Sequence, residues 1–288
     1  KVGAGAGHSV GEITAAVGAG VMTAEQAMVF VRERGRAMAA AAAVTPTGMT
    51  AVLGGDRDEV VAAAEKHGLT AANENGAGQI VVAGTLEQLE AFAAEPPAKA
   101  RLRALQVAGA FHTRHMGPAV AELAALAKSI YVHDTRLRLI SNADGQVVHS
   151  GRDVLTRLVT QVSNPVRWDL CMQTMGEIGV TALLELTPGG TLTGLAKRGL
   201  PGVETLALNT PDDLPAAWDL IERHATVAPT SQSPTWRLLV APAKGTFRLG
   251  VTSESGDSLV AGAAIGSIVN LRDEQPVLAP HGGTVVEW

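Results

Sequence analysis

The sequence predicts an α/β protein that contains a smaller inserted sub-domain and ends in a separate all-β segment. Between Thr50 and Ala110, short apolar strands alternate with helical patterns, which is typical of a split βαβ unit. Helical patterns and further strands flank this unit as far as His224,. Residues 227–235 are rich in Pro, Ser and Thr, as in an exposed linker, and beyond them the helical period disappears,. The linker therefore separates a first domain, residues 1–226, from a second, residues 236–288.

Composition narrows the class of protein. The chain has 288 residues, 46% hydrophobic and 18% charged, with a mean hydropathy of +0.17. This composition supports a buried core and excludes a disordered or collagen-like chain. The net charge is −5, from 23 Lys plus Arg against 28 Asp plus Glu, so no nucleic-acid partner is expected. Cys171 is the single cysteine and cannot form an internal disulfide, which predicts a cytoplasmic location.

Membrane insertion is not expected either. The least charged stretches, Met38–Gly55 and Ser258–Leu271, are interrupted by Gly, Ser and Thr. A bilayer-spanning helix needs about 20 consecutive apolar residues, and neither stretch supplies them.

The first long helix is predicted from Thr23 to Ala43. Thr23 and Gln26 have the spacing of a capping box, Ala, Met and Arg favour the helix, and Pro46 ends it. The elements predicted after it are strand Thr50–Gly54, helix Arg57–Gly68, strand Gln79–Gly84, helix Leu86–Glu95, strand Ala100–Ala110, helix Gly117–Ser129, strand Leu137–Ala143, helix Asp153–Val162, a buried strand Thr181–Thr187, helix Leu192–Arg198 and helix Asp212–His224,.

The C-terminal segment contains an internal repeat. Ala241–Thr246 (APAKGT) recurs as Ala279–Thr284 (APHGGT), each after a short apolar strand, which implies a domain of two matched halves. The second copy is followed by only a few residues, so we expect the end of this domain to be missing. At the other end, Lys1 stands in place of Met and a motif follows almost at once, so an N-terminal truncation is also expected.

The strongest chemical signal is Gly7-His8-Ser9-Val10-Gly11, followed by a helical pattern. A nucleophile elbow needs small residues around a serine in a strand-to-helix turn, which exposes the serine Oγ. The same turn aims the Val10 N–H at a developing oxyanion. From the pattern alone, a glycine-rich turn with an incidental serine is an equally open alternative.

A nucleophilic serine needs a base and a feature that selects its substrate. Among eight histidines, His112 and His115 follow the last strand of the inserted unit, where catalytic groups often lie,. His115 is expected to start a helix, which leaves His112 as the candidate base; a structural histidine is the alternative. Arg34 is a candidate binding residue because Gly35 beside it suggests a close approach, but a solvated arginine on a charged helix face is the reading that the residues alone favour.

Seven ordered motifs resemble the malonyl-CoA:acyl carrier protein transacylase family, from about Gly5 to about Leu220. They are GHSVGE, AAVGAGVMTAEQA, VRERGRAM, NGAGQIVVAG, GAFHTRHM, QVSNPVRW and ELTPGGTLTGLAKR. The resemblance implies an α/β-hydrolase-like acyltransferase core. It also implies an inserted ferredoxin-like sub-domain at about residues 43–107 that forms one wall of the cleft.

The resemblance also implies roles for individual residues. Ser9 matches the acylated nucleophile, His112 the base, and Arg34 the residue that pairs with the free carboxylate of the substrate. Gln161 matches the position whose backbone carbonyl orients the histidine, a task for which no third acid is needed. A planar guanidinium binds a carboxylate through two parallel hydrogen bonds, which favours malonyl over acetyl groups. Phe111 resembles the version of this loop that prefers malonyl over methylmalonyl.

The implied reaction is transfer of malonyl from malonyl-CoA to the phosphopantetheine thiol of acyl carrier protein, in fatty-acid biosynthesis, through a malonyl-serine intermediate. No metal or redox cofactor is implied. The family's N-terminal Gly-Gln-Gly motif, which supplies a second oxyanion donor, is absent from this sequence. Less than full activity is therefore expected of the chain as it stands, since losing one such donor lowers the rate by ~10²–10³.

Residues 236–288 resemble part of a biotinyl/lipoyl-type barrel-sandwich module, through APAKGTF, GDSLVAGAAIGSI and APHGGTV. A working carrier has a lysine at the hairpin between its halves, where this chain has Val269–Asp273 without lysine. Lys244, the one lysine of the module, lies in the first repeat instead. We therefore expect neither biotin nor lipoate, and interpret the module as a docking or structural appendage.

Three alternative functions stay open. The first is an acyltransferase that serves polyketide assembly, with the same chemistry and another carrier protein. The second is a non-catalytic interaction protein derived from the transferase. The third is a simple serine esterase, which would hydrolyse short neutral esters.

Overall fold

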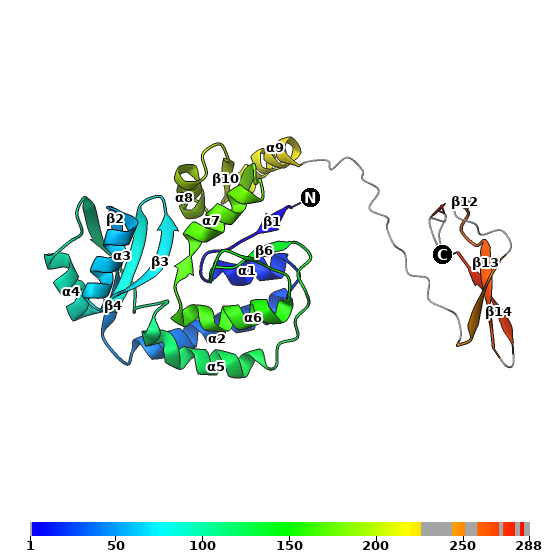
Figure 1. The fold of residues 1–288 in the computed structure, drawn as a ribbon, viewed down its shortest axis with the longest axis horizontal. Helices are drawn as coiled ribbons and strands as arrows, with labels where there is room; N and C mark the ends of the chain where they lie inside the picture. Colours follow the sequence, from blue (N-terminus) through cyan, green and yellow to red (C-terminus); the bar gives the residue numbers. More distant parts are fainter. Residues whose placement is uncertain (1, 226–243, 251–257, 271–272, 280–282, 285–288) are drawn as a thin grey trace. The chain divides into compact units, whose positions relative to one another are not determined.

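The computed structural model describes residues 2–225, 244–250, 258–270, 273–279 and 283–284. The chain divides into two compact units, residues 1–226 and residues 227–288 (Figure 1). The predicted linker, residues 227–235, lies outside the described residues, as do parts of both repeat copies and Leu271 and Arg272 of the hairpin. No helix in the described ranges is long and apolar enough to cross a bilayer.

The candidate nucleophile lies in a turn between strand β1 (Ala4–Gly5) and helix α1 (Gly11–Gly18). Strand β1 pairs in parallel with β6 (Arg138–Ile140), which pairs antiparallel with β7 (Val147–Val148). A strand that leads directly into a helix places this turn at the carboxyl end of the strand, where α/β proteins usually carry their sites.

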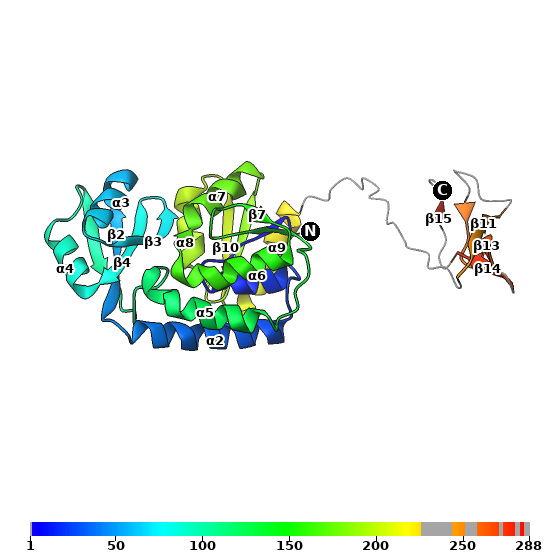
Figure 2. The ribbon, with the colours of Figure 1, turned by 60° about the horizontal axis from the view of Figure 1, so that its bottom comes forward.

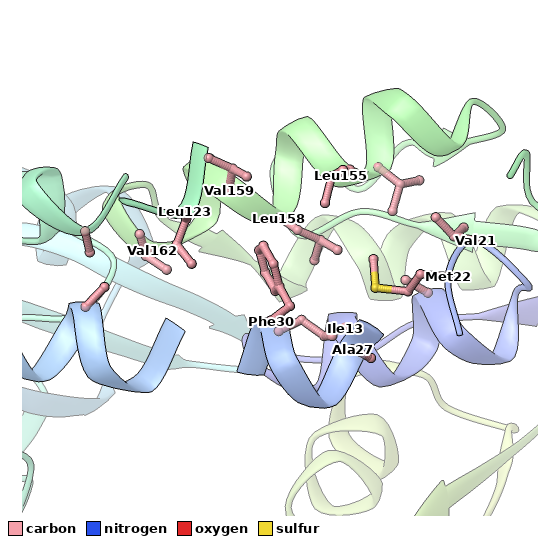
Figure 3. Packing of buried hydrophobic residues seen from close by; sticks show 14 of the residues in the cluster. Ile13, Val21, Met22, Ala27, Phe30, Leu123, Leu155, Leu158, Val159 and Val162 are labelled. Atoms are coloured by element: carbon pink, nitrogen blue, oxygen red, sulfur yellow. The ribbon is translucent and has the colours of Figure 1, made fainter. Parts of the chain in front are cut away.

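Four helices pack into the largest core beside this turn. They are α1, α2 (Ala24–Ala42), α5 (Gly117–Ala127) and α6 (Gly151–Thr160), and the last three lie side by side in both ribbon views (Figures 1 and 2). Ile13, Phe30 and Leu158 are fully buried where the helices meet (Figure 3). Each such side chain contributes about 1.5–3 kcal/mol to folding when it leaves water. The predicted capping box at Thr23 and Gln26 is confirmed.

The inserted sub-domain is a sheet with two helices on it. Its elements are β2 (Thr47–Gly54), α3 (Arg57–Lys66), β3 (Thr70–Gly76), β4 (Gln79–Thr85), α4 (Leu86–Ala94) and β5 (Ala100–Ala104). The strand order is β5-β2-β4-β3-β8, and the last strand, β8 (Val166–Arg167), joins β3 in parallel from a distant part of the chain.

The strands predicted for the sub-domain were wrong in two details. Strand β3 was not predicted, because its sequence TAANENG is rich in residues of low β-propensity,. Several of its polar side chains are nevertheless buried, among them Asn73, Glu74 and Asn75. The strand predicted from Ala100 to Ala110 ends at Ala104, and the rest of that stretch belongs to the loop that leads to His112.

The remaining elements of the first unit are helix α7 (Trp168–Glu177), strand β9 (Ala182–Leu186), helix α8 (Thr191–Gly199), strand β10 (Glu204–Leu208) and helix α9 (Leu214–His224). Helix α7 was not predicted; its N-cap, Arg167, makes no side-chain capping hydrogen bond. Strand β10 is a short run that was also missed. The expectation that β9 is a buried strand was wrong: it pairs with β10 alone among the described strands, and Leu186 is 59% exposed.

The second unit has only strands within its described ranges. Strands β11 (Thr246–Leu249), β13 (Ala264–Val269) and β14 (Glu274–Leu278) form an antiparallel sheet in that order. Strands β12 (Ser258–Leu259) and β15 (Gly283–Thr284) form a second antiparallel pair. Ile265, Ile268, Val277 and Ala279 make up a small apolar core.

Candidate active site

The turn around Ser9 is tight and strained. Ser9 has a φ of 53°, in the left-handed region that L-residues rarely adopt,. A Cβ at Gly7 would lie 2.0 Å from the carbonyl oxygen of Gly11, whereas a Cβ at Gly11 would meet open space. The steric need for glycine therefore falls on Gly7, and the expectation that small residues are needed on both sides of Ser9 was wrong for Gly11.

Ser9 and His112 lie 103 positions apart in the chain and meet in the structure. The Oγ of Ser9 lies 2.7 Å from the Nε2 of His112, and the Nδ1 of His112 lies 2.8 Å from the backbone oxygen of Gln161. A carbonyl oxygen can only accept a hydrogen bond, so Nδ1 carries the hydrogen. The Nε2 atom is then left free to accept the proton of Ser9.

Burial keeps the His112 imidazole neutral. The residue is 4% exposed, and desolvation lowers its pKa to about 4. The Gln161 carbonyl opposes this shift, and the nearby charge of Arg34 adds to it. The ring is therefore an unprotonated acceptor at neutral pH.

Arg34 lies inside the first unit, although the charged sequence around it favoured a solvated side chain. It is 7% exposed, and its Nη2 donates to Ser9 Oγ over 3.1 Å and to Gln161 Oε1 over 3.0 Å. Among the described residues nothing pairs with its buried Nε. Burial lowers the pKa of Arg34 to about 10, with Glu12 opposing the shift, so the guanidinium is still a cation at neutral pH.

The proposed reason for Gly35 was wrong. A Cβ at this position would meet nothing within 4 Å, so no close approach explains the glycine. The burial of Arg34 follows from the way α2 packs against the Ser9 turn.

Val10 and Phe111 lie beside the two residues of the dyad. Val10 directly precedes α1, and in the described part of the chain its backbone N–H has no acceptor. The ring of Phe111 is partly buried and contacts both the helical core and the cluster on the sub-domain sheet. His8, the neighbour of Ser9 on the other side, bonds Asn75 of β3 over 2.8 Å and contacts the ring of Trp168.

A buried polar network that was not predicted supports these residues. The Gln161 side chain donates from Nε2 to the backbone oxygen of Ser9 over 3.0 Å and to the carboxylate of Glu12. Glu12 is 3% exposed. Burial raises its pKa, which the backbone N–H of Asn142 and the Gln161 amide oppose. An acid in the first turn of an apolar helix is the one sequence signal that could have identified Glu12, whereas Asn142 has none.

The described residues contain no cluster of three His, Cys, Asp or Glu side chains that could hold a metal ion. The arrangement offers a serine, a neutral base, a fixed cation and a free backbone N–H around one point. These groups are suited to acyl transfer from a substrate that bears a negative charge.

Comparisons with known proteins show which family this chain is similar to. The model of the "Acyl transferase domain" family matches residues 3–212. The malonyl CoA-acyl carrier protein transacylase of Mycobacterium bovis is 53% identical over 209 residues, which span 73% of this chain and 69% of that protein.

Solved structures give the same result. The crystal structure of MCAT from Mycobacterium tuberculosis superposes with a TM-score of 0.71 at 53% identity, over 73% of this chain and 69% of that one. A malonyl-transacylase solved in complex with its holo type II PKS acyl-carrier protein has a TM-score of 0.69 at 32% identity, over 74% and 71% of the two chains. The chain therefore belongs to the acyl transferase domain family and, within it, to the malonyl CoA-acyl carrier protein transacylases.

Proposed function

We propose that this chain transfers the malonyl group of malonyl-CoA to the phosphopantetheine thiol of acyl carrier protein, as a step of fatty-acid biosynthesis. The observation that carries this proposal is the position of Arg34. Its buried guanidinium lies 3.1 Å from the Oγ of Ser9 and has a free Nε among the described residues. An acyl group on Ser9 that ends in a carboxylate would meet this cation directly.

The first half-reaction forms a malonyl-serine ester. As Ser9 Oγ bonds to the thioester carbon, its proton passes to His112 Nε2, 2.7 Å away. When the tetrahedral intermediate collapses, the carbon–sulfur bond breaks and the coenzyme A sulfur takes the proton from Nε2. The Gln161 carbonyl holds the Nδ1 hydrogen throughout and stabilises the imidazolium that forms between the two steps,.

The backbone N–H of Val10 is the oxyanion donor of this mechanism. It lies at the start of α1, where backbone N–H groups point out of the helix and favour negative charge,. The N–H of Ser9 is not available, because it donates to the side chain of Asn142 over 2.8 Å.

The second half-reaction reverses the first with a different thiol. The phosphopantetheine thiol gives its proton to His112 Nε2 as its sulfur attacks the ester carbon. The bond from carbon to Ser9 Oγ then breaks, and Oγ recovers the proton. Coenzyme A leaves before the carrier protein binds, so the kinetics are ping-pong. We expect the cleft between the sub-domain and the rest of the first unit to keep water from the ester.

Selectivity is divided between two residues in this proposal. Arg34 binds the distal carboxylate, since a guanidinium offers two parallel donors to a planar anion. Phe111 limits the space beside His112 and so disfavours an α-methyl branch, which changes the rate by about 10- to 200-fold at most. Neither role needs a metal or a redox cofactor.

The test is the intact mass of the full chain after incubation with malonyl-CoA and, separately, with acetyl-CoA. A malonyl adduct is expected that is lost in Ser9→Ala and reduced in Arg34→Ala, with little adduct from acetyl-CoA. Rapid hydrolysis of short neutral esters without an adduct would favour an esterase. Neither adduct nor hydrolysis would favour an interaction protein without catalytic activity.

Polyketide assembly is the second candidate pathway. It is favoured by the malonyl-transacylase that was solved with its type II PKS acyl-carrier protein, to which this chain is 32% identical. The chemistry at Ser9 is the same in both pathways. Comparing KM for a fatty-acid carrier protein with KM for a polyketide carrier protein separates the two.

The finer description of the architecture is also part of the proposal. A serine between β1 and α1, beside the parallel strand β6, supports an α/β-hydrolase-like core,. The two strand pairings of the C-terminal unit, β11-β13-β14 and β12-β15, support a barrel-sandwich-like module that serves as an appendage. We propose a cytoplasmic location because the sequence has a single, unpaired cysteine,.

A further inference from the structure

One carboxamide bridges the two sides of the nucleophile turn. Asn142 follows strand β6 and is fully buried, with 0% exposure. Its Oδ1 accepts the backbone N–H of Ser9 over 2.8 Å, and its Nδ2 donates to the backbone oxygen of Gly7 over 2.8 Å. These two backbone groups lie on either side of His8, so the side chain of Asn142 spans the turn.

The turn needs such a support. Ser9 has a φ of 53°, which is unfavourable for a residue with a Cβ and persists only when the surroundings hold it in place. If the Ser9 backbone relaxed, the Oγ would leave the position from which it reaches His112 Nε2 at 2.7 Å.

Asn142 is itself held from two directions. Its backbone N–H donates to Glu12 Oε1 over 3.0 Å, and its carbonyl accepts the backbone N–H of Arg167 over 2.8 Å. Glu12 belongs to α1 and Arg167 to β8. The carboxamide is therefore presented to the turn by a fixed backbone.

We propose that Asn142 is a positioning residue for acyl transfer, which holds the Ser9 turn in its strained form through the Ser9 N–H and the Gly7 carbonyl. This inference rests on the proposed function, because it concerns the rate at which Ser9 is acylated. The carboxamide supplies the donor and the acceptor that the turn needs at any pH, because it does not titrate. By occupying the Ser9 N–H, Asn142 also leaves the Val10 N–H as the donor that faces the oxyanion.

The test compares Asn142→Leu with the wild type and with a matched control, Asn209→Leu. Asn209 is an exposed carboxamide that bridges the backbone N–H and carbonyl of one residue, Gly189, at 2.6 and 3.4 Å. Each full-length protein is mixed with malonyl-CoA, quenched, and weighed intact, and the rate is normalised to the folded fraction. Asn142→Leu is expected to form the adduct about 100-fold more slowly, a loss typical of a misplaced reacting group. Its KM for malonyl-CoA should be unchanged, because Arg34 is untouched.

A second variant distinguishes positioning from a general loss of stability. In Asn142→Asp the introduced carboxyl group has both a donor and an acceptor only while it is protonated. The acylation rate relative to wild type should therefore be highest at acidic pH and fall as this group ionises. Glu12 and Cys171 are the titratable groups that contact Asn142, and the wild-type profile recorded in parallel gives their contribution in the absence of the new carboxyl group. The Asn209→Leu protein should keep the wild-type profile.

The outcomes distinguish a failure of the positioning role of Asn142 from a failure of the proposed function. An unchanged rate per folded molecule in Asn142→Leu, or a flat rate ratio for Asn142→Asp, would overturn the positioning role while the proposed function stands. If Asn142→Leu does not fold, the pH dependence of the acylation rate of Asn142→Asp decides whether Asn142 is a positioning residue. If the wild type itself forms no malonyl adduct, the proposed function fails and this inference fails with it.

Discussion

The guanidinium of Arg34 donates to the hydroxyl of Ser9 over 3.1 Å, from the middle of one helix to the turn before another. A cation is therefore built into the place where an acyl group would be attached. The same Nη2 also bonds Gln161 Oε1, so the free enzyme already holds the guanidinium in one orientation. A substrate that carries a carboxylate gains from this arrangement, and a neutral one does not.

Replacing Arg34 should change substrate selectivity more than reactivity. In Arg34→Ala we expect kcat/KM for malonyl-CoA to fall about 10- to 100-fold, since a hydrogen bond to a charged group contributes about 1.5–3 kcal/mol. Arg34→Lys should be nearly as poor, because an ammonium cannot form the two-pronged contact. The measurement is the malonyl-to-acetyl ratio of kcat/KM. Arg36→Ala is the control, since Arg36 lies on the same helix with a 71% exposed side chain; equal losses for both substrates in Arg34→Ala would argue against this role.

Glu12 should act on Arg34 through the amide of Gln161. One oxygen of the Glu12 carboxyl group accepts Gln161 Nε2 and the other accepts the backbone N–H of Asn142, which leaves Gln161 Oε1 for Arg34. In Glu12→Gln one of these two acceptors is lost, and we expect KM for malonyl-CoA to rise about three- to tenfold with a smaller change in kcat.

The matched control is Glu185→Gln, which replaces a carboxylate that accepts backbone N–H groups at the start of α8. A fall in kcat alone, with KM unchanged in Glu12→Gln, would contradict a role that passes through Arg34.

The pH dependence of acylation should reflect the buried imidazole. His112 accepts a proton only while it is neutral, and burial lowers its pKa to about 4. The rate of adduct formation should therefore be constant from neutral pH down to about pH 5 and fall as His112 becomes protonated near pH 4. In Arg34→Ala the acidic limb should move to higher pH, because the charge of Arg34 contributes to lowering the pKa. A limb near pH 6.5 in the wild type would mean that the histidine is not buried in this way.

Two glycines of the same motif should respond differently to alanine. Gly7→Ala places a Cβ 2.0 Å from the carbonyl oxygen of Gly11, whereas Gly11→Ala meets nothing within 4 Å. We expect Gly7→Ala to lose the adduct and to lower the free energy of unfolding by more than about 2 kcal/mol, as overpacking does. Gly11→Ala should be neutral or stabilising by up to about 1 kcal/mol, since alanine favours the helix. Urea unfolding together with adduct formation measures both effects, and similar behaviour of the two variants would argue against this account of the turn.

Phe111 should control tolerance of an α-methyl branch. We expect Phe111→Ser to raise kcat/KM for methylmalonyl-CoA relative to malonyl-CoA by about tenfold, in the range expected for a single methyl group. Phe111→Leu controls for the loss of packing, because the ring contacts two apolar clusters. The ratio of kcat/KM for the two thioesters is the readout, and equal gains for both substrates would exclude a steric filter.

Local sequence patterns predicted the elements that carry a signal within their own sequence, such as a capping box or a short apolar run. The helix after Thr23 was predicted because its capping box lies within one turn. The predicted strands Gln79–Gly84 and Thr181–Thr187 correspond to β4 and β9, and they were predicted because their apolar runs are local. Among helices without a side-chain cap, α5, α8 and α9 were still predicted from their periodicity, whereas α7 was missed,. Helix α7 has no side-chain cap, and β3 is a strand because its neighbours β4 and β8 pair with it.

The arrangement of the site could not be predicted from local sequence patterns. No spacing rule connects Ser9 with His112, and composition favoured a solvated Arg34; the family resemblance alone suggested that the three meet. Even so, the side chain of Gln161 and both Glu12 and Asn142 were not foreseen. Their roles depend on which buried donors find acceptors, and such pairing is decided by the tertiary fold.

Strand β8 connects the sub-domain sheet with the segment that holds His112. Gln161, whose carbonyl holds His112, is followed within five residues by β8, and β8 is hydrogen-bonded to β3 at the edge of the sub-domain sheet. A movement of the sub-domain away from β8 would therefore have to break these hydrogen bonds. A displacement of β3 that kept this pairing would also displace the segment that sets the imidazole tautomer, so the position of the sub-domain and the orientation of His112 are connected through β8.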